Sequence, residues 1–134
     1  MIVSTRGRYA LRVLIDIAEH SSEDRIPLKE IAERQDISQK YIEAIMTMLS
    51  KNGLVDAVHG KGGGYRLNRA PSEYKVGDIL RLTEGTLAPV ACLEKNAKPC
   101  SRESICRTLP MWSKLDELVE NYLDSVTFAD LMKK

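Results

Sequence analysis

The sequence lacks a strong net charge, a long uninterrupted apolar run and the residues that dominate irregular folds. Lysine and arginine number 20 against 19 acidic residues, for a formal net charge of +1, so bulk electrostatics from a charged tail does not drive function. There are only 8 glycines and 5 prolines, and aromatic residues make up 5%, which excludes collagen-like, low-complexity and disordered chains. With 43% apolar residues over 134 positions, the composition predicts one mainly helical globular domain.

The first twenty residues lack the features of a signal peptide or a membrane span. Their apolar stretch is interrupted by the charges of Arg6, Arg8, Arg12 and Asp16, whereas both kinds of segment need an unbroken apolar run. We therefore expect a cytoplasmic protein with no membrane partner. In that reducing compartment, the odd number of 3 cysteines argues against a disulfide framework.

Apolar periodicity and turn residues predict the order of helices and strands. The predicted helices run from about 6 to 20, from 27, from 38 to 53, from 76 to about 85 and from about 104 to 125, and the predicted strands span 54–58 and 65–68. Pro27 is expected in a first helical turn, Ser38 as a helix cap and Gly53 as a left-handed helix end. The fold class expected is mainly α with a small β-hairpin.

Two short helices with a tight connection, followed by a glycine-tipped hairpin, are typical of a winged helix-turn-helix. A recognition helix buries one face in its own domain and offers the polar side chains of the other face to base edges and phosphates. The predicted DNA-binding residues are Ser38, Gln39, Lys40, Tyr41, Glu43 and Thr47 of the helix and His59, Lys61, Gly62, Gly63 and Arg66 of the wing. Between residues 38 and 69 there are five basic residues and two acids, so this window is locally basic.

These assignments have plainer alternatives. The glycine-rich turn is also compatible with a hairpin that binds nothing, although it is not a P-loop because the GxxxxGK[ST] spacing is absent. Tyr41 is equally compatible with a core position, and Glu43 with a solvated helix residue. Next to phosphates an acid is costly unless it accepts a hydrogen bond from a cytosine amino group, and Glu43 would then discriminate between bases.

The three cysteines, Cys92, Cys100 and Cys106, form a C-x7-C-x5-C pattern in a loop. Thiolates are soft ligands that suit iron–sulfur clusters, zinc or copper(I), and nearby Lys and Arg side chains would offset their charge. Structural zinc normally needs four ligands, and neither histidine lies near the loop in sequence. Three inert free thiols are a further alternative. The pattern favours an iron–sulfur cluster with an incomplete cysteine set.

Five stretches of the chain resemble the IscR-type family of Rrf-type winged helix-turn-helix regulators of bacteria. They are STRGRYALRVLIDIA, IPLKEIAERQDISQKYIEAIMTMLSKNGLV, HGKGGGYRL, VGDILRLTEG and the three-cysteine loop, and the resemblance runs from residue 1 to about 132. It implies a homodimeric transcription factor with a long dimerisation helix at about 104–125. It also implies a [2Fe-2S] or [4Fe-4S] cluster, easily lost on purification, with Cys92, Cys100 and Cys106 as ligands and with an effect on DNA binding.

The cysteine loop departs from the IscR branch in two ways. That branch has a histidine three residues after its last cysteine, where this chain has Leu109, and the longer first cysteine gap is similar to that of the iron-responsive RirA branch. In the nitric-oxide-sensing NsrR branch an acidic residue near the partner's N-terminus can complete the cluster, but the matching stretch here is Arg6-Gly7-Arg8. The fourth ligand therefore stays open. The CymR branch, which regulates cysteine metabolism, lacks the cluster, and the loop cysteines count against it.

We therefore expect a regulator with a winged helix-turn-helix DNA-binding domain (1–85), a cluster-binding loop (86–106) and a dimerisation helix with a C-terminal segment (107–134). As a homodimer it would bind a palindromic operator in double-stranded DNA, and the cluster would report iron, cluster or redox status. The alternatives are a cluster-free thiol or cysteine-metabolism regulator of the same family and a small iron–sulfur carrier protein. We do not expect an enzyme, because no His or Asp stands in a context that activates a cysteine and no nucleotide fingerprint is present.

Overall fold

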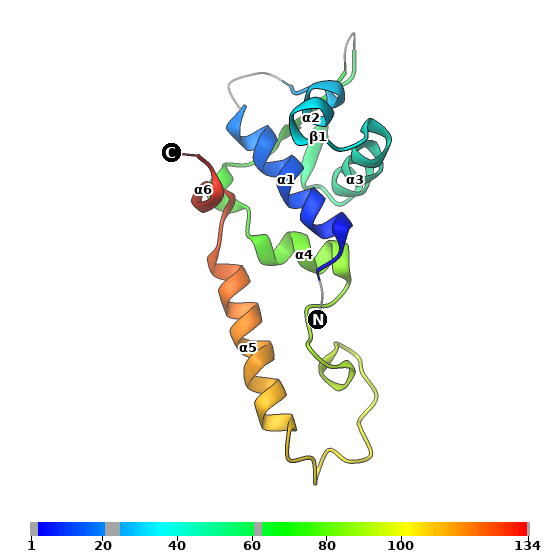
Figure 1. Ribbon diagram of the computed structural model, residues 1–134, viewed down its shortest axis with the longest axis vertical. Coiled ribbons are helices and arrows are strands. Elements are labelled where there is room, and N and C mark those ends of the chain that lie inside the picture. Colours follow the sequence, from blue (N-terminus) through cyan, green and yellow to red (C-terminus); the bar gives the residue numbers. More distant parts are fainter. Residues whose placement is uncertain (1–2, 21–24, 61–62, 134) are drawn as a thin grey trace.

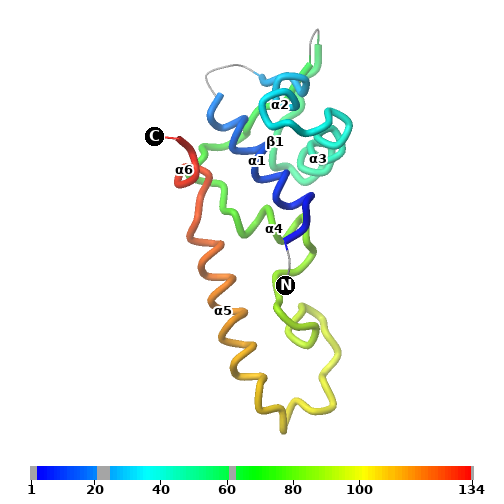
Figure 2. The backbone as a smooth tube through the Cα atoms, viewed as in Figure 1, coloured from blue at the N-terminus to red at the C-terminus, as the bar shows by residue number. Residues whose placement is uncertain are grey.

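The computed structural model describes residues 3–20, 25–60 and 63–133. Its elements, in chain order, are α1 (Thr5–Glu19), α2 (Leu28–Gln35), α3 (Gln39–Lys51), β1 (Val55–Ala57), β2 (Tyr65–Leu67), the 3-10 turn η1 (Pro71–Glu73), α4 (Val76–Glu84), the 3-10 turn η2 (Ala91–Leu93), α5 (Leu109–Ser125) and α6 (Phe128–Leu131). In Figure 1 the first three helices, the hairpin and α6 form one end of the molecule, with α4 beneath them. The backbone trace in Figure 2 shows α5 and the loop before it projecting from α4 as a long arm.

Helix α1 is the centre of the fold, as its apolar sequence predicts. It contacts α2, α3, α4, α6 and β2, and Ala10, Val13 and Leu14 are fully buried. The Ser4 side chain caps its start by accepting a hydrogen bond from the backbone N–H of Gly7, which satisfies one of the free donors of the first turn. The helix thus contacts most of the other elements at this end of the molecule.

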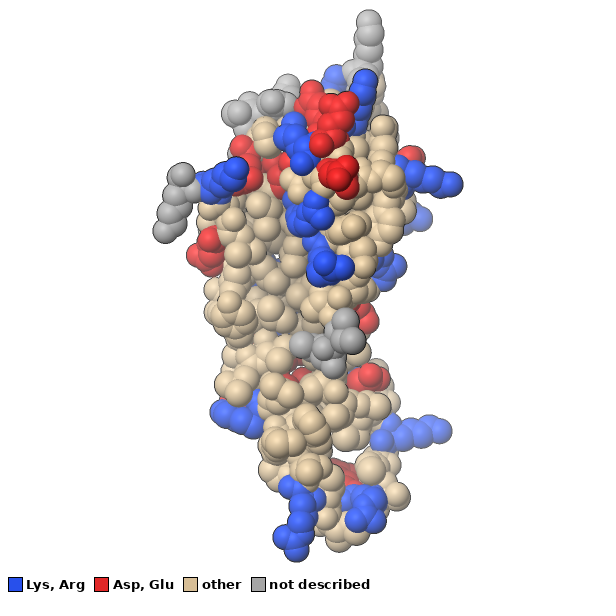
Figure 3. All heavy atoms as spheres, viewed as in Figure 1, with Lys and Arg blue, Asp and Glu red and all other residues tan. Residues whose placement is uncertain are grey.

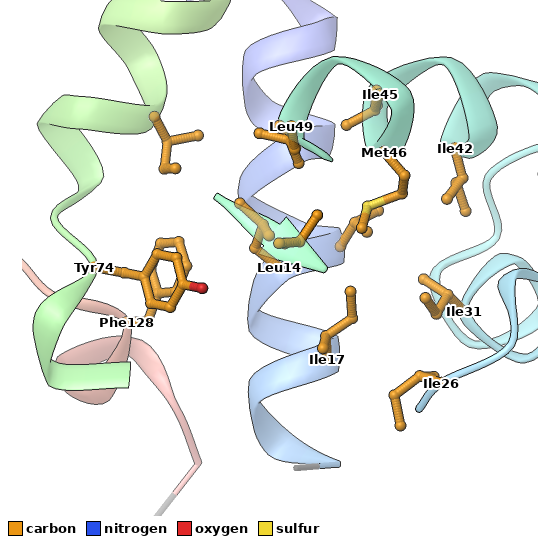
Figure 4. Packing of buried hydrophobic residues seen from close by; sticks show 14 of the residues in the cluster. Leu14, Ile17, Ile26, Ile31, Ile42, Ile45, Met46, Leu49, Tyr74 and Phe128 are labelled. Atoms are coloured by element: carbon orange, nitrogen blue, oxygen red, sulfur yellow. The ribbon is translucent and has the colours of Figure 1, made fainter. Parts of the chain in front are cut away.

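Helix α3 packs against α1 through the apolar spacing seen in the sequence. Ile42, Ile45, Met46 and Leu49 are buried, and Figure 4 shows them directed toward Leu14 and Ile17 of α1 and Ile26 and Ile31 near α2. Burial of each such side chain stabilises the fold by roughly 1.5–3 kcal/mol. Because this face is occupied, the opposite face of α3 is left to solvent.

The hairpin pairs Val55 with Leu67 and Ala57 with Tyr65 in antiparallel register. Its strands are shorter than the predicted 54–58 and 65–68, but the mainly helical fold with a small hairpin is confirmed. Tyr65 also bridges to Ile26, with backbone hydrogen bonds of 2.9 and 3.2 Å. This bridge ties the wing to the start of α2. Pro27, expected inside the first turn of α2, instead occupies its N-cap position.

Helix α6 returns the chain to the main core. Phe128 is fully buried and its ring stacks on Tyr74, with ring centroids 4.7 Å apart. The Tyr74 hydroxyl donates to the backbone carbonyl of Leu54 at 2.6 Å, next to β1. The segment after α5 therefore packs with the end of the molecule that carries α1, α3 and the hairpin.

Helix α5 begins at Leu109, so the predicted start near Ser104 is wrong. Pro110 lies in the first turn, and a proline further inside a helix would clash with the carbonyl of the residue four positions earlier, here Cys106. The apolar positions of α5 divide into two groups. Val119, Leu123 and the following Val126 pack against Val76, Leu80 and Leu87, whereas Met111, Leu115, Leu118 and Tyr122 remain exposed.

Candidate DNA-binding surface and cysteine loop

The first turn of α3 is capped and its polar face is exposed. Ser38 Oγ accepts a hydrogen bond from the Tyr41 backbone N–H at 3.2 Å, as the sequence predicts. The six helix residues predicted to contact DNA are all exposed: Ser38, Gln39, Lys40, Tyr41, Glu43 and Thr47. Their exposure is what groove reading requires, and their contact with DNA stays a prediction.

Tyr41 is neither a core residue nor a free side chain. It is 37% exposed, and its ring packs edge-on against Tyr9 of α1, with centroids 5.5 Å apart and an interplanar angle of 71°. The Thr47 hydroxyl donates to the backbone carbonyl of Glu43 at 2.8 Å. Within the described residues the Glu43 carboxylate has no ion pair, so it is available to accept from a base.

The wing is held close to the helices by a glycine turn. Gly63 donates to Gly60 at 3.0 Å and Val58 donates to Gly64 at 2.8 Å. Gly64 has a φ of +136°, and a Cβ there would lie 2.9 Å from the Ile26 carbonyl oxygen, so only glycine fits. Of the predicted wing residues, His59 and Arg66 are exposed and Gly63 is half-buried, whereas Lys61 and Gly62 lie outside the described residues.

Arg66 is less available than its position suggests. Its guanidinium lies 3.9 Å from the Asp56 carboxylate across the hairpin, and both side chains are about half exposed. A pair of this kind is weak in water, so Arg66 can exchange Asp56 for a phosphate at little cost.

A hollow of about 390 Å³ separates the wing from the two helices; we term it the wing hollow. Lys29 of α2 and Gln39 of α3 line one side, and His59 with the wing glycines lines the other. Of the residues predicted to bind DNA, Gln39 of α3 and His59 and Gly63 of the wing thus border one surface. The sequence analysis did not identify Lys29 as a residue of this surface. Its position in the first turn of α2, shortly after the N-cap Pro27, could have indicated it.

All three cysteines line a second hollow, of about 220 Å³, in the loop before α5; we term it the cysteine hollow. Cys92 and Cys100 are exposed, and Cys106 is half-buried. Leu93, Glu103 and Leu109 complete much of its wall. Within the described residues no three His, Cys, Asp or Glu side chains stand at metal-binding spacing, so the thiols share a hollow without being assembled as ligands.

Cys106 has a distinct environment. A hydrogen bond with the Thr108 hydroxyl, at 3.5 Å, lowers the pKa of this thiol, with help from the backbone N–H of Thr108 and the charge of Arg102. A lower pKa raises the thiolate fraction, the form that binds soft metals.

Two polar clusters that join α4 to its neighbours, one to α5 and one to the start of α1, were not found from the sequence. Arg81 of α4 binds both Glu120 and Asp124 of α5, the latter at 2.8 Å. Glu84, at the end of α4, accepts hydrogen bonds from the side chain and backbone N–H of Ser4. These contacts join residues 39 to 80 positions apart, and local patterning carries no signal for such pairs.

A third polar cluster lies at the α1–α2 junction. Asp16 is only 3% exposed, and Arg34 and Gln35 of α2 donate to its carboxylate at 2.6 and 2.8 Å. In the sequence Asp16 is the one acidic residue inside the apolar run of α1, between Ile15 and Ile17, which could have marked it as a buried, paired residue.

A tri-helical core with a capped, half-exposed third helix and a wing bordering it defines a winged helix-turn-helix DNA-binding protein. The Rrf2 family profile, described as "Iron-dependent Transcriptional regulator", matches residues 3–134. The chain belongs to the Rrf2 family of transcriptional regulators, as the sequence resemblance indicates. The same match confirms the expectation that it is a regulator and not an enzyme.

Individual relatives agree with this assignment. Protein rrf2 of Nitratidesulfovibrio vulgaris is 39% identical over 133 residues, covering 99% of this chain and 88% of that protein. The HTH-type transcriptional regulator IscR of Serratia proteamaculans is 37% identical over 132 residues, covering 98% of this chain and 79% of that one.

Solved structures show the same fold. CymR of B. subtilis, described as the global cysteine regulator, has a TM-score of 0.79 at 34% identity and matches 98% of this chain and 95% of its own. T. potens IscR has a TM-score of 0.76 at 39% identity, with 98% and 85% covered. Across residues 3–20, 25–60 and 63–133, we find no helix with the length and apolar character that a membrane crossing requires.

Proposed function

We propose that the protein is a homodimeric regulator whose binding to a palindromic operator is set by an iron–sulfur cluster held by Cys92, Cys100 and Cys106. The supporting observation is that all three thiols of the C-x7-C-x5-C loop line the one cysteine hollow. Since the proposed ligand is DNA, the protein would act in the cytoplasm, where bacterial DNA lies.

The donor set fits such a cluster. Three thiolates with no histidine in the hollow are soft ligands of the kind that iron–sulfur clusters use, and Lys98 lines the hollow to offset their charge. When bound, the cluster would supply a centre sensitive to electrons, oxygen or nitric oxide. The loop would have to draw the thiols closer, because they do not stand at ligand spacing in the described residues.

Both ends of the loop are attached to elements that lead to the DNA-binding end. Leu87, 2% exposed, is buried between α4 and α5, and Leu109 both begins α5 and lines the cysteine hollow. A change in the loop therefore acts on the start of α5 and on α4. The Arg81 ion pairs then couple α5 to α4, and Glu84 couples α4 to the start of α1.

The second copy would cover the exposed face of α5. Met111, Leu115, Leu118 and Tyr122 are between 39% and 67% exposed, and their spacing of four, three and four residues places them on one stripe of the helix. Such a stripe is typical of a helix that pairs with another helix. A twofold dimer would present two recognition helices to half-sites about 34 Å apart.

The test begins with metal and sulfide analysis of protein purified without oxygen, with ultraviolet–visible and Mössbauer spectra. A duplex selected by the protein from a random-sequence pool then serves as operator for binding with and without the cluster. We expect the cluster to change affinity or selectivity, and a Cys92→Ala, Cys100→Ala, Cys106→Ala variant to lose the cluster and the change together. Identical binding by both forms would refute the switch.

A cluster-free thiol regulator is the second candidate. It is favoured by the structural likeness to CymR and by the absence of preassembled ligands among the described residues. In that case oxygen-free protein would hold no iron, and mild oxidation of the thiols would change operator binding. Iron analysis therefore separates the two candidates.

A further inference from the structure

The N-terminal half of α1 lies directly beside the first turn of α3. Tyr9 of α1 meets Tyr41 of α3 edge to face, with centroids 5.5 Å apart. The Arg12 guanidinium carbon lies 5.1 Å from the centroid of the Tyr9 ring. The Arg12 cation of α1 thus contacts the Tyr9 ring, and the Tyr9 ring contacts Tyr41 of the recognition helix.

Hydrogen bonds to Gln35 of α2 hold the Arg12 side chain in place. Its Nε donates to the Gln35 side-chain oxygen at 3.2 Å, and its Nη2 donates to the Gln35 backbone carbonyl. The Gln35 amide in turn donates to the buried Asp16 at 2.8 Å. Arg12 is nevertheless exposed, and a guanidinium has five N–H donors, so donors remain for an incoming anion.

Arg8 lies one turn earlier on α1 and is also exposed. It donates to the Thr5 hydroxyl at 3.1 Å. Residues four apart on a helix share a face, so Arg8 and Arg12 form one basic strip on α1, which we term the α1 strip. Figure 3 shows basic side chains over α1 on the face in view and acidic ones above them, over α2.

The α1 strip and the wing flank opposite sides of α3. Gln39 lines the wing hollow, whereas Tyr41, two residues later, packs on α1. Two residues along an α-helix correspond to a rotation of about 200°. The first turn of α3 therefore has the wing on one side and α1 on the other.

We propose that the α1 strip is a second DNA-backbone clamp, in which Arg8 and Arg12 bind phosphates of the strand on the side of α3 away from the wing. The major groove is about 12 Å wide and a helix with its side chains about 10–12 Å across, so α3 fills the groove. The phosphates that border the groove then fall on the elements beside α3. This inference rests on the proposed DNA binding and adds to it a contact surface and two residues.

The acidic side chains of α2 limit this clamp. Glu30 and Glu33 are exposed on the next helix and would repel phosphates. This repulsion directs the DNA backbone along the first half of α1 and away from α2. Gln35 acts as a positioning residue, because its side-chain and backbone oxygens accept hydrogen bonds from Arg12.

The experiment measures affinity for the selected duplex against salt concentration, for the wild type and for Arg8→Ala, Arg12→Ala, Arg12→Lys and the double alanine variant. Each lost phosphate contact should reduce the slope of log K against log[salt] by about 0.9 and weaken binding about eightfold near 0.1 M salt. Arg12→Lys should keep most of the slope because it keeps the charge. The matched control is Lys75→Ala, which removes one exposed charge beside α6. It should leave the slope unchanged.

Contacts to the DNA backbone carry no sequence information. The ratio of affinities for selected and scrambled duplexes should therefore be the same in Arg8→Ala and Arg12→Ala as in the wild type. Circular dichroism verifies that each variant is folded, and Arg8→Ala provides a second reading if Arg12→Ala is unstable. An unchanged salt slope in Arg8→Ala and in the double alanine variant would overturn the clamp. If Lys40→Ala weakens binding while the α1 variants do not, only the clamp fails; if the wild type prefers no duplex, the proposed function fails with it.

Discussion

Asp16 is the buried group on which the junction of α1 and α2 depends, and replacing it with asparagine tests this. The substitution keeps the shape and removes the charge. Arg34 donates to both carboxylate oxygens, at 2.6 to 3.2 Å, and Gln35 donates to one of them at 2.8 Å. An asparagine presents one acceptor and one donor group to these donors, so at least one of them is left facing an N–H.

The expected cost follows from the exposure of the two partners. Breaking a fully buried ion pair costs about 3–5 kcal/mol, and Asp16 is 3% exposed. Arg34, however, is 33% exposed, so water recovers part of its solvation. We expect a loss of about 2.5 kcal/mol in the free energy of unfolding, which at a urea m-value of about 1.5 kcal/mol/M moves the midpoint by about 1.7 M.

The effect must also depend on pH. Burial alone raises the pKa of Asp16, but hydrogen bonds from Arg34 and Gln35 and the charge of Arg34 outweigh it, so the pKa in the folded protein lies below the ordinary 3.8. Since the folded pKa is lowered, the stabilisation is complete above the unfolded value and is lost as the pH falls through the folded one. Each pH unit below the unfolded pKa removes up to about 1.4 kcal/mol.

Urea unfolding followed by circular dichroism at pH 7 and pH 3, at one protein concentration, measures both effects. The control is Glu30→Gln, because Glu30 approaches the same Arg34 at 3.8 Å but is 48% exposed; we expect it to cost less than about 0.5 kcal/mol. The difference between wild type and Asp16→Asn should shrink at pH 3. Equal costs for the two substitutions, or a difference that persists unchanged at pH 3, would refute the assignment of Asp16 as a buried, ionised partner.

Three further outcomes test other parts of the structure. Phe128→Ala should cost about 3–5 kcal/mol in urea unfolding, because the ring is fully buried against the core; a loss below about 1 kcal/mol would show that α6 does not pack there. Leu118→Glu, at an exposed position of α5, should give a folded monomer in analytical ultracentrifugation, and a persisting dimer would place the interface elsewhere. Gly64→Ala should destabilise the protein and weaken operator binding more than Gly63→Ala does. A Cβ at Gly64 would lie 2.9 Å from the Ile26 carbonyl oxygen, whereas a Cβ at Gly63 would lie 3.9 Å from the Val58 carbonyl oxygen. Equal melting temperatures and affinities of the two variants would contradict the wing geometry.

The elements near the recognition helix were predictable because their signals are local. The Ser38 cap, the spacing of Ile42 and Ile45, and the left-handed end at Gly53 each act over a few residues, and the structure confirms all three. The start of α5 was misplaced because the apolar spacing continues toward Ser104, while the steric effect of Pro110 prevents the helix from beginning earlier than Leu109. Periodicity alone does not report where a proline allows a helix to begin.

By itself the sequence determined the helix order, the wing, the exposed polar face of α3 and the membership of a family of regulators, because period, capping and turn chemistry are written in neighbouring residues. Only the tertiary structure decided which apolar residues of α5 pack on α4, that three thiols share one hollow and that Arg12 stands beside Tyr41. Each of these depends on how whole elements pack against one another. A local sequence pattern does not report how elements pack in space, so it could not predict these contacts.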